Sequence, residues 1–238
     1  MCAAKKTNYQ AVKNTALSLL HIPIEETDFS PIVVMHPIFE SGFVSAKING
    51  EFKIINILES EDNLQMAIKI WETNFNNADT VEKIYGFIRK SYRLTFLKFV
   101  KPYLSAKDFA TLLADAWISS ENPNQDVNVS TKTAISWFKQ ANKKYLMSEE
   151  EYDYYESLPQ TVTVYRGVAV GRNPKGLSWT CNLKTAEWFA NRFNTENKQG
   201  YIQYLEVDKS LVLAYFNGRD EDEIVLDTTN IMKQIKCM

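Results

Sequence analysis

Three short strand-like segments in the last third of the chain each carry a polar element. Tyr165-Arg166-Gly167 closes the alternating segment 161–165, and Ser178-Trp179-Thr180 alternates hydroxyl, aromatic and hydroxyl side chains. Glu221-Asp222-Glu223 precedes the apolar run at 224–226. Alternating and β-branched residues favour strands, so these segments predict a sheet that carries an arginine, hydroxyls and carboxylates.

The Glu221-Asp222-Glu223 segment is chemically the most informative of the three. Side chains alternate between the two faces of a strand, so Glu221 and Glu223 are expected on one face, about 6.6 Å apart at roughly 3.3 Å per residue. Asp222 is expected to turn away. Carboxylates suit the stabilisation of an oxocarbenium-like transition state, as in cleavage of a glycosidic bond. The alternative is a solvated acidic turn, because residues 220–223 are all acidic.

Arg166 and the hydroxyl segment complete the set. A planar guanidinium donates hydrogen bonds in pairs and suits pyrophosphate or ribose oxygens. Gly167, directly after it, lets backbone approach a ligand closely. In the hydroxyl segment, Ser178 and Thr180 share one face and Trp179 packs on the other. A surface ion-pair partner is the alternative interpretation of Arg166.

The order of these elements resembles the core of the mono-ADP-ribosyltransferase superfamily of bacteria and phages, over about residues 161–230. The resemblance implies a split β-sheet core that binds NAD as a substrate. In the family, the second glutamate hydrogen-bonds the nicotinamide ribose and the first helps to activate the acceptor. These roles fall on Glu223 and Glu221, and Arg166 corresponds to the arginine of the first core strand.

The resemblance also assigns the hydroxyl segment. The segment Ser178-Trp179-Thr180 corresponds to the family's Ser-Thr-Ser strand, which shapes the nicotinamide pocket. Gly167 is expected to lie beside this NAD-binding site. Cys181 stands in place of the third hydroxyl, which departs from the family pattern. After it, Asn182 is expected to cap a helix whose apolar stripe is Ala186, Phe189, Ala190 and Phe193. Trp188 and Arg192 lie off this stripe, so they can lie at the border of the NAD site.

The implied reaction is transfer of ADP-ribose from NAD to a macromolecular acceptor, with release of nicotinamide. In the family a Glu-x-Glu pair accompanies arginine modification, so a protein arginine is one expected acceptor. RNA or DNA is a second expected acceptor, because of the basic and aromatic stretch described below. Phe216 and Arg219, in the loop before the glutamates, are expected to recognise the acceptor. Such enzymes serve as toxins, defence effectors or host modifiers, which adds an antitoxin or inhibitor as an expected partner. The alternative function is a catalytically inactive module that binds NAD or ADP-ribose.

The N-terminal part of the chain has a different pattern. Residues 31–58 are predicted to form strands, with a hairpin turn at Asn49-Gly50. Helices are predicted after Ser60, with cap-like starts at Ser105 and Ser148 and a break at Asn122-Pro123-Asn124. The expected fold is therefore α+β. Residues 1–104 form a hairpin and helical region, and residues 105–238 form helices plus the split-sheet core.

The stretch 83–107 has seven basic residues, no acidic residue and six aromatic residues. Cations beside stackable rings favour single-stranded nucleic acid. The alternative is a pair of amphipathic helices that bury the rings in a core.

Composition bounds the remaining classes of function. With 27 basic and 29 acidic residues, the net charge does not indicate a nucleic-acid-binding or membrane-binding protein. The apolar runs are too short to span a bilayer. Cys2, Cys181 and Cys237 have no metal-site spacing, and an odd number of cysteines indicates reduced thiols and a cytoplasmic location. No metal is expected at the site.

Overall fold

The computed structural model describes residues 5–48, 50–120, 123 and 126–238. The chain forms two compact units, of which unit 1 contains Met1–Leu112 and Ser119–Glu121, and unit 2 contains Leu113–Ile118 and Asn122–Met238. The sequence predicts a boundary after residue 104. In the structure, helix α5 (Ala106–Ser119) contributes residues to both units. Helices and antiparallel sheets are both present, so the prediction of an α+β protein is confirmed.

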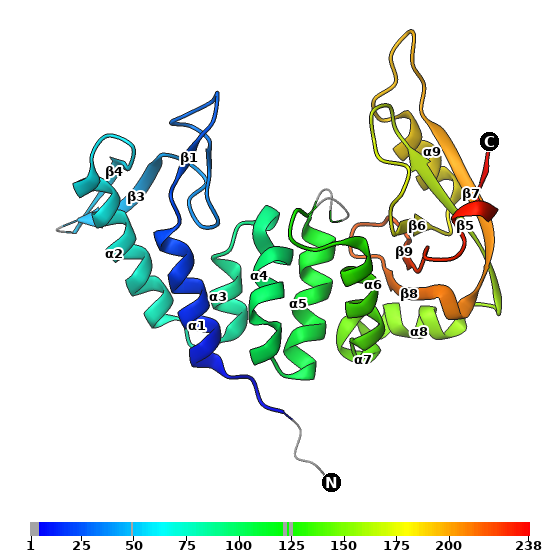
Figure 1. Cartoon of the computed structure of the whole chain (residues 1–238), viewed down its shortest axis with the longest axis horizontal. Coiled ribbons are helices and arrows are strands. Elements are labelled where there is room, and N and C mark those ends of the chain that lie inside the picture. The colour runs from blue at the N-terminus through cyan, green and yellow to red at the C-terminus, as the bar shows by residue number, and fades with distance from the viewer. Residues whose placement is uncertain (1–4, 49, 121–122, 124–125) are drawn as a thin grey trace. The chain divides into compact units, whose positions relative to one another are not determined.

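The elements follow one another as Figure 1 labels them. Besides α5, the helices are α1 (Tyr9–Ser18), α2 (Glu61–Asn77), α3 (Val81–Gly86), α4 (Arg93–Val100), α6 (Thr131–Gln140), α7 (Lys143–Leu146), α8 (Glu149–Ser157) and α9 (Leu183–Asn191). The strands are β1 (Glu25–Glu26), β2 (Val34–Met35), β3 (Phe43–Ile48), β4 (Glu51–Asn56), β5 (Thr161–Val168), β6 (Ser178–Thr180), β7 (Tyr201–Asp208), β8 (Val212–Phe216), β9 (Glu223–Leu226) and β10 (Lys236–Cys237).

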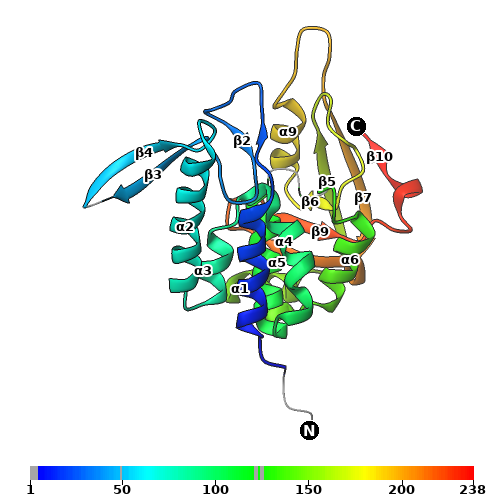
Figure 2. The same ribbon diagram turned by 60° about the vertical axis from the view of Figure 1, so that its left-hand side comes forward.

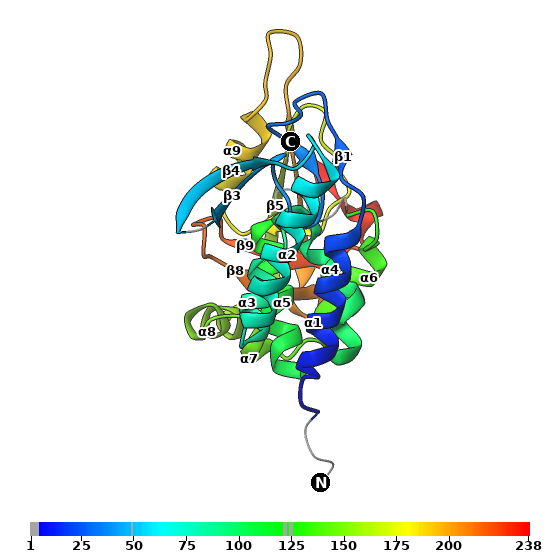
Figure 3. The ribbon, with the colours of Figure 1, turned by 90° about the vertical axis from the view of Figure 1, so that its left-hand side faces the viewer.

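Unit 1 combines helices with two small antiparallel sheets. Strands β3 and β4 pair from Phe43 opposite Asn56 onward, and α2 packs against this hairpin (Figure 2). The predicted turn involves Asn49, which lies outside the described residues. Helix α1 packs on α2, α3 and α4 (Figure 3). The rings of Trp71, Phe75 and Phe87 meet in the core of this unit.

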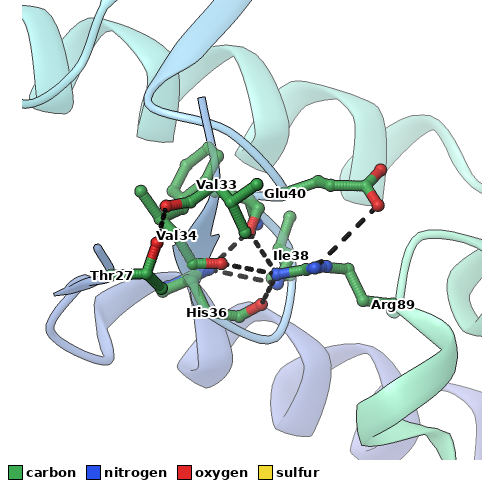
Figure 4. Close-up of polar contacts among 8 residues, drawn as sticks. Thr27, Val33, Val34, His36, Ile38, Glu40 and Arg89 are labelled. Atoms are coloured by element: carbon green, nitrogen blue, oxygen red, sulfur yellow. Dashed lines mark hydrogen bonds and ion pairs between the residues drawn. The ribbon is translucent and has the colours of Figure 1, made fainter. Parts of the chain in front are cut away.

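The guanidinium of Arg89 holds the loop that follows β2 (Figure 4). Its Nη1 atom donates to the backbone carbonyls of Val34 at 2.8 Å, Phe39 at 3.1 Å and His36 at 3.4 Å. Its Nη2 atom lies 3.9 Å from a carboxylate oxygen of Glu40. Only 22% of the Arg89 side chain is exposed, so this cation stabilises the loop.

Replacing Arg89 by Ala should lower the free energy of unfolding by about 2–3 kcal/mol, because it leaves the loop's buried carbonyls without their donor. Urea denaturation followed by circular dichroism measures this loss. The matched control is Lys90→Ala at the exposed neighbour, which should change stability by less than about 0.5 kcal/mol. Equal losses for the two variants would contradict the structural role of Arg89.

Unit 2 is built on a six-stranded antiparallel sheet in the order β10-β7-β5-β6-β9-β8. Strands β5 and β7 pair along their whole length, from Thr161 opposite Asp208 to Val168 opposite Tyr201. All residues of β8 and β9 are buried. Helix α9 packs on β5 and β7, and α6 and α8 pack on β8 (Figure 1).

Three predicted helix starts are confirmed by their cap hydrogen bonds. The hydroxyl of Ser105 accepts from the backbone N–H of Asp108 at 3.0 Å. Ser148 forms a capping box at the start of α8, and the side chain of Asn182 accepts the first amides of α9. The predicted break at 122–124 involves Asn122 and Asn124, which lie outside the described residues.

The predicted apolar stripe of α9 is only partly a core stripe. Ala186 and Ala190 are buried, but the helix ends at Asn191 and Phe193 is 41% exposed. The predicted stripe extends two residues beyond the end of the helix. In the part of the chain that the structure describes, no helix is long and apolar enough to cross a membrane.

Candidate functional site

The three predicted polar segments lie side by side in the sheet of unit 2. Strand β6 is between β5 and β9, with Tyr165 opposite Thr180 and Thr180 opposite Glu223. Ser178 lies opposite Val225. Residues as far apart in the sequence as Tyr165 and Glu223 therefore meet in three neighbouring strands.

The guanidinium of Arg166, on β5, binds backbone carbonyls of β6 and of the loop before it. Its Nη1 atom donates to the carbonyl of Ser178 at 2.5 Å, and its Nη2 atom donates to the carbonyl of Asn173 at 3.3 Å. A Cβ atom on Gly176 would lie 2.5 Å from Nη2, so the glycine leaves room for the guanidinium. Burial lowers the pKa of Arg166, and the nearby Glu223 carboxylate raises it. Arg166 is thus held inside the site, and the alternative of a surface ion-pair partner is wrong.

Glu223 is the first residue of β9 and is only 7% exposed. Its Oε1 atom accepts a 2.9 Å hydrogen bond from the indole Nε1–H of Trp117, on α5. Burial raises the pKa of Glu223, while hydrogen bonds from Ser178 and Trp117 and the charge of Arg219 lower it. Sequence reasoning missed Trp117, which lies 106 residues before Glu223 and belongs to no recognisable motif.

Glu221 and Glu223 do not share one strand face, so that prediction was wrong. Strand β9 begins at Glu223, and Glu221 lies in the preceding turn. Both neighbours of Glu221 have left-handed backbone conformations, with φ of 54° at Asp220 and 46° at Asp222. Such residues interrupt the extended backbone that alternation requires. The Glu221 carboxylate lies 2.7 Å from the guanidinium of Arg219 instead.

Asp222 anchors this turn. Its carboxylate accepts from the hydroxyl of Tyr215 at 2.8 Å and from the side-chain amide of Asn182 at 3.3 Å. Burial and the charge of Asp222 raise the pKa of the Cys181 thiol to about 11, so this cysteine remains protonated at neutral pH. The turn is in part the acidic turn considered as an alternative, and only Glu223 enters the sheet.

Of the two residues predicted to recognise an acceptor, Phe216 is placed differently. It ends β8, is 2% exposed and lies opposite Glu223, so the prediction that Phe216 lies in the loop before the glutamates was wrong. Its ring faces Phe138 of α6 at a centroid distance of 6.4 Å, because β8 is covered by helices. Arg219 lies in the turn with 44% of its side chain exposed.

The remaining predicted site residues shape the site from within. Trp179 is 3% exposed, and its Nε1–H donates to the carbonyl of Gly176 at 3.1 Å. The hydroxyl of Thr180 donates to the backbone carbonyl of Glu221 at 3.0 Å, which ties the turn to β6. Gly167 was expected to admit a ligand, but helix α9 occupies that space: a Cβ atom there would lie 2.1 Å from the carbonyl oxygen of Ala186.

A cavity of about 300 Å³ begins two residues after Arg166, at the end of β5. Its lining includes Val168, Arg172 and Tyr201. On α9, Trp188 is 58% exposed and the guanidinium of Arg192 lies 5.3 Å from the centroid of its ring. Neither Trp188 nor Arg192 lines this cavity, so the structure does not bring them to it.

The basic stretch 83–107 supplies structural contacts in unit 1. Tyr85 and Phe96 are buried, as the core interpretation requires. The guanidinium of Arg93 lies 4.8 Å from the centroid of the Tyr85 ring. Phe99 and Tyr103 remain partly exposed. The core interpretation is therefore confirmed for Tyr85 and Phe96, and Phe87 packs against Trp71 and Phe75.

A comparison of the chain with protein-family models, with curated proteins and with solved structures found no match. Among the described residues, no cluster of three His, Cys, Asp or Glu side chains is arranged to hold a metal ion. Arg166, Ser178 and Glu223 are therefore the residues whose geometry bears on function.

Proposed function

We propose that the chain is an NAD-dependent mono-ADP-ribosyltransferase that transfers ADP-ribose from NAD to a macromolecular acceptor and releases nicotinamide. The observation that carries this proposal is the meeting of Arg166, Ser178 and Glu223 on three adjacent strands. Arg166 binds the carbonyl of Ser178, and the side chain of Ser178 hydrogen-bonds Glu223. An anion-binding group, a polar link and a carboxylate thus form one continuous site.

Two features of the site fit NAD as a substrate. The Nε atom of Arg166 is buried and has no hydrogen-bond partner within the described part of the chain, and an unpaired buried donor of this kind is unusual outside functional sites. The cavity at the end of β5, with Arg172 and Tyr201 in its lining, has a volume at the lower end of the range for small-molecule pockets, about 300–1,000 Å³. These features support binding of an anionic, ring-containing molecule at the end of β5.

The proposed chemistry breaks the bond between nicotinamide and C1 of its ribose. The bonding electron pair leaves with nicotinamide, which departs as a neutral molecule, and positive charge develops on the ribose. The ionised carboxylate of Glu223 stabilises that charge. A nucleophile of the acceptor then bonds to C1 and loses a proton.

The turn before β9 is the proposed acceptor side of the site. The carboxylate of Glu221 already holds a guanidinium, that of Arg219, at 2.7 Å. A carboxylate that binds one guanidinium at the surface suits a second one from another protein. Protein arginine is therefore the favoured acceptor.

Incubation with NAD labelled in its adenylate phosphate and a cell lysate tests the transfer. Label that survives nuclease and is removed by protease supports a protein acceptor. Label that survives protease and is removed by nuclease would replace it with a nucleic-acid acceptor. The absence of macromolecular label with every lysate tested would contradict the transferase proposal.

Glu221→Gln should reduce transfer to the acceptor more than it reduces NAD hydrolysis, because Glu221 lies outside β9 and faces the acceptor side. The expected loss in transfer is about tenfold, the size of one lost charge-assisted contact. The ratio of labelled acceptor to released nicotinamide measures the difference. An equal fall in both products would contradict a role restricted to the acceptor.

A further inference from the structure

The indole of Trp117 is fixed by its surroundings in unit 2. Trp117 is 1% exposed, and its ring meets Phe138 edge to face at a centroid distance of 5.0 Å. Phe138 is fully buried and also faces Phe216, the residue opposite Glu223 in the sheet. The aromatic contacts leave the indole N–H directed at one acceptor, the Oε1 atom of Glu223.

We propose that Trp117 is a positioning residue that orients the Glu223 carboxylate toward the ribose of NAD. This inference rests on the proposed function for its effect on catalysis. The hydrogen bond itself is independent of that function. The proposal gives a role to helix α5, which lies outside all three polar segments.

The chemistry of indole suits this role. An indole N–H donates one hydrogen bond and cannot accept a proton from the carboxylate. It is also uncharged, so it holds Oε1 without cancelling the negative charge that the developing oxocarbenium needs. Because Oε1 is held by Trp117, the orientation of the whole carboxylate is fixed. A lysine or arginine at this position would pair with the carboxylate and weaken its effect.

The other groups around Glu223 do not replace this donor. Arg166 on β5 and Arg219 in the turn are the cations near the carboxylate, and Glu221 in the same turn is the nearby anion. Ser178 on β6 supplies a second neutral hydrogen bond. Both guanidinium groups already have oxygen partners elsewhere, at Ser178 and Glu221.

Trp117→Phe removes the N–H and retains an aromatic ring against Phe138. The Glu223 carboxylate then loses a hydrogen-bond donor that favours its ionised form, so the pKa of Glu223 rises. As the solution is acidified, the variant should therefore lose NAD cleavage at a higher pH than the parent does. On the acid limb, kcat should fall about tenfold, the size of one hydrogen bond to a charged group, while NAD affinity by calorimetry stays nearly unchanged. Trp71→Phe makes the same change in the core of unit 1 and should leave the pH profile unaltered.

Nuclear magnetic resonance tests the contact without catalysis. The side-chain carboxyl carbon of Glu223, assigned by its loss in Glu223→Gln, should titrate at a higher pH in Trp117→Phe than in the parent. In the parent protein, the indole N–H resonance of Trp117 should titrate with the same midpoint as Glu223, which removes any dependence on the folding of the variant. A pH-independent indole resonance, or equal carboxyl midpoints in folded parent and variant, would overturn the inference. Absence of nicotinamide release by the parent would count against the proposed reaction and leave these two resonance tests valid.

Discussion

Glu223→Gln should lower the rate of nicotinamide release by about 100-fold or more, which corresponds to roughly 3 kcal/mol of transition-state stabilisation. The amide retains the shape of the side chain and can still accept the hydrogen bond from Trp117. It removes the negative charge that stabilises the developing positive charge on the ribose. Nicotinamide measured by chromatography with purified protein gives the rates.

The matched control is Glu206→Gln on β7, an exposed glutamate of the same sheet, which should release nicotinamide at the parental rate. The parent should also lose activity as the pH falls through a pKa above the ordinary glutamate value, because burial raises the pKa of Glu223 and only its ionised form is active. Parental rates in folded Glu223→Gln protein would remove Glu223 from the mechanism.

Gly167→Ala should destabilise unit 2 by more than about 4 kcal/mol and prevent stable folding. The new Cβ atom would lie 2.1 Å from the carbonyl oxygen of Ala186 and 2.5 Å from the amide nitrogen of Ala190. Both are backbone atoms of α9, so the whole helix must move away from β5. Thermal unfolding followed by circular dichroism and the yield of soluble protein measure the effect.

Gly86→Ala is the control for this substitution. A Cβ atom at Gly86 meets nothing within 4 Å. The same chemical change should therefore be neutral, or stabilising by up to about 1 kcal/mol through the lower entropy of the unfolded chain. Similar thermal midpoints for the Gly167 variant and the parent would contradict the close packing of α9 on β5.

Features governed by neighbouring residues were predictable from the sequence. The alternating segment at 161–165 lies within β5, and the caps at Ser105, Ser148 and Asn182 begin helices as expected. Each depends on side chains within a few positions of the backbone groups that they serve. The order of the polar segments also predicted residues that the sheet brings together, namely Tyr165, Thr180 and Glu223.

Features governed by distant contacts were not predictable. Glu221 leaves the strand because the turn around it is held by Asp222, whose partners include Asn182, 40 residues earlier. Phe216 is buried because helices from earlier in the chain cover β8. Trp117 reaches Glu223 across 106 residues. Local periodicity carries no information about these pairings.

NAD cleavage by this site can be tested with the purified parent protein alone. Nicotinamide released from added NAD is measured by chromatography, and NAD binding is measured by calorimetry on the same sample. We predict that nicotinamide accumulates over repeated turnovers and that ADP-ribose or a modified acceptor accounts for the same amount of NAD. Saturable NAD binding by a folded protein, with no nicotinamide released over hours, would rule out NAD cleavage and identify the chain as an NAD-binding module.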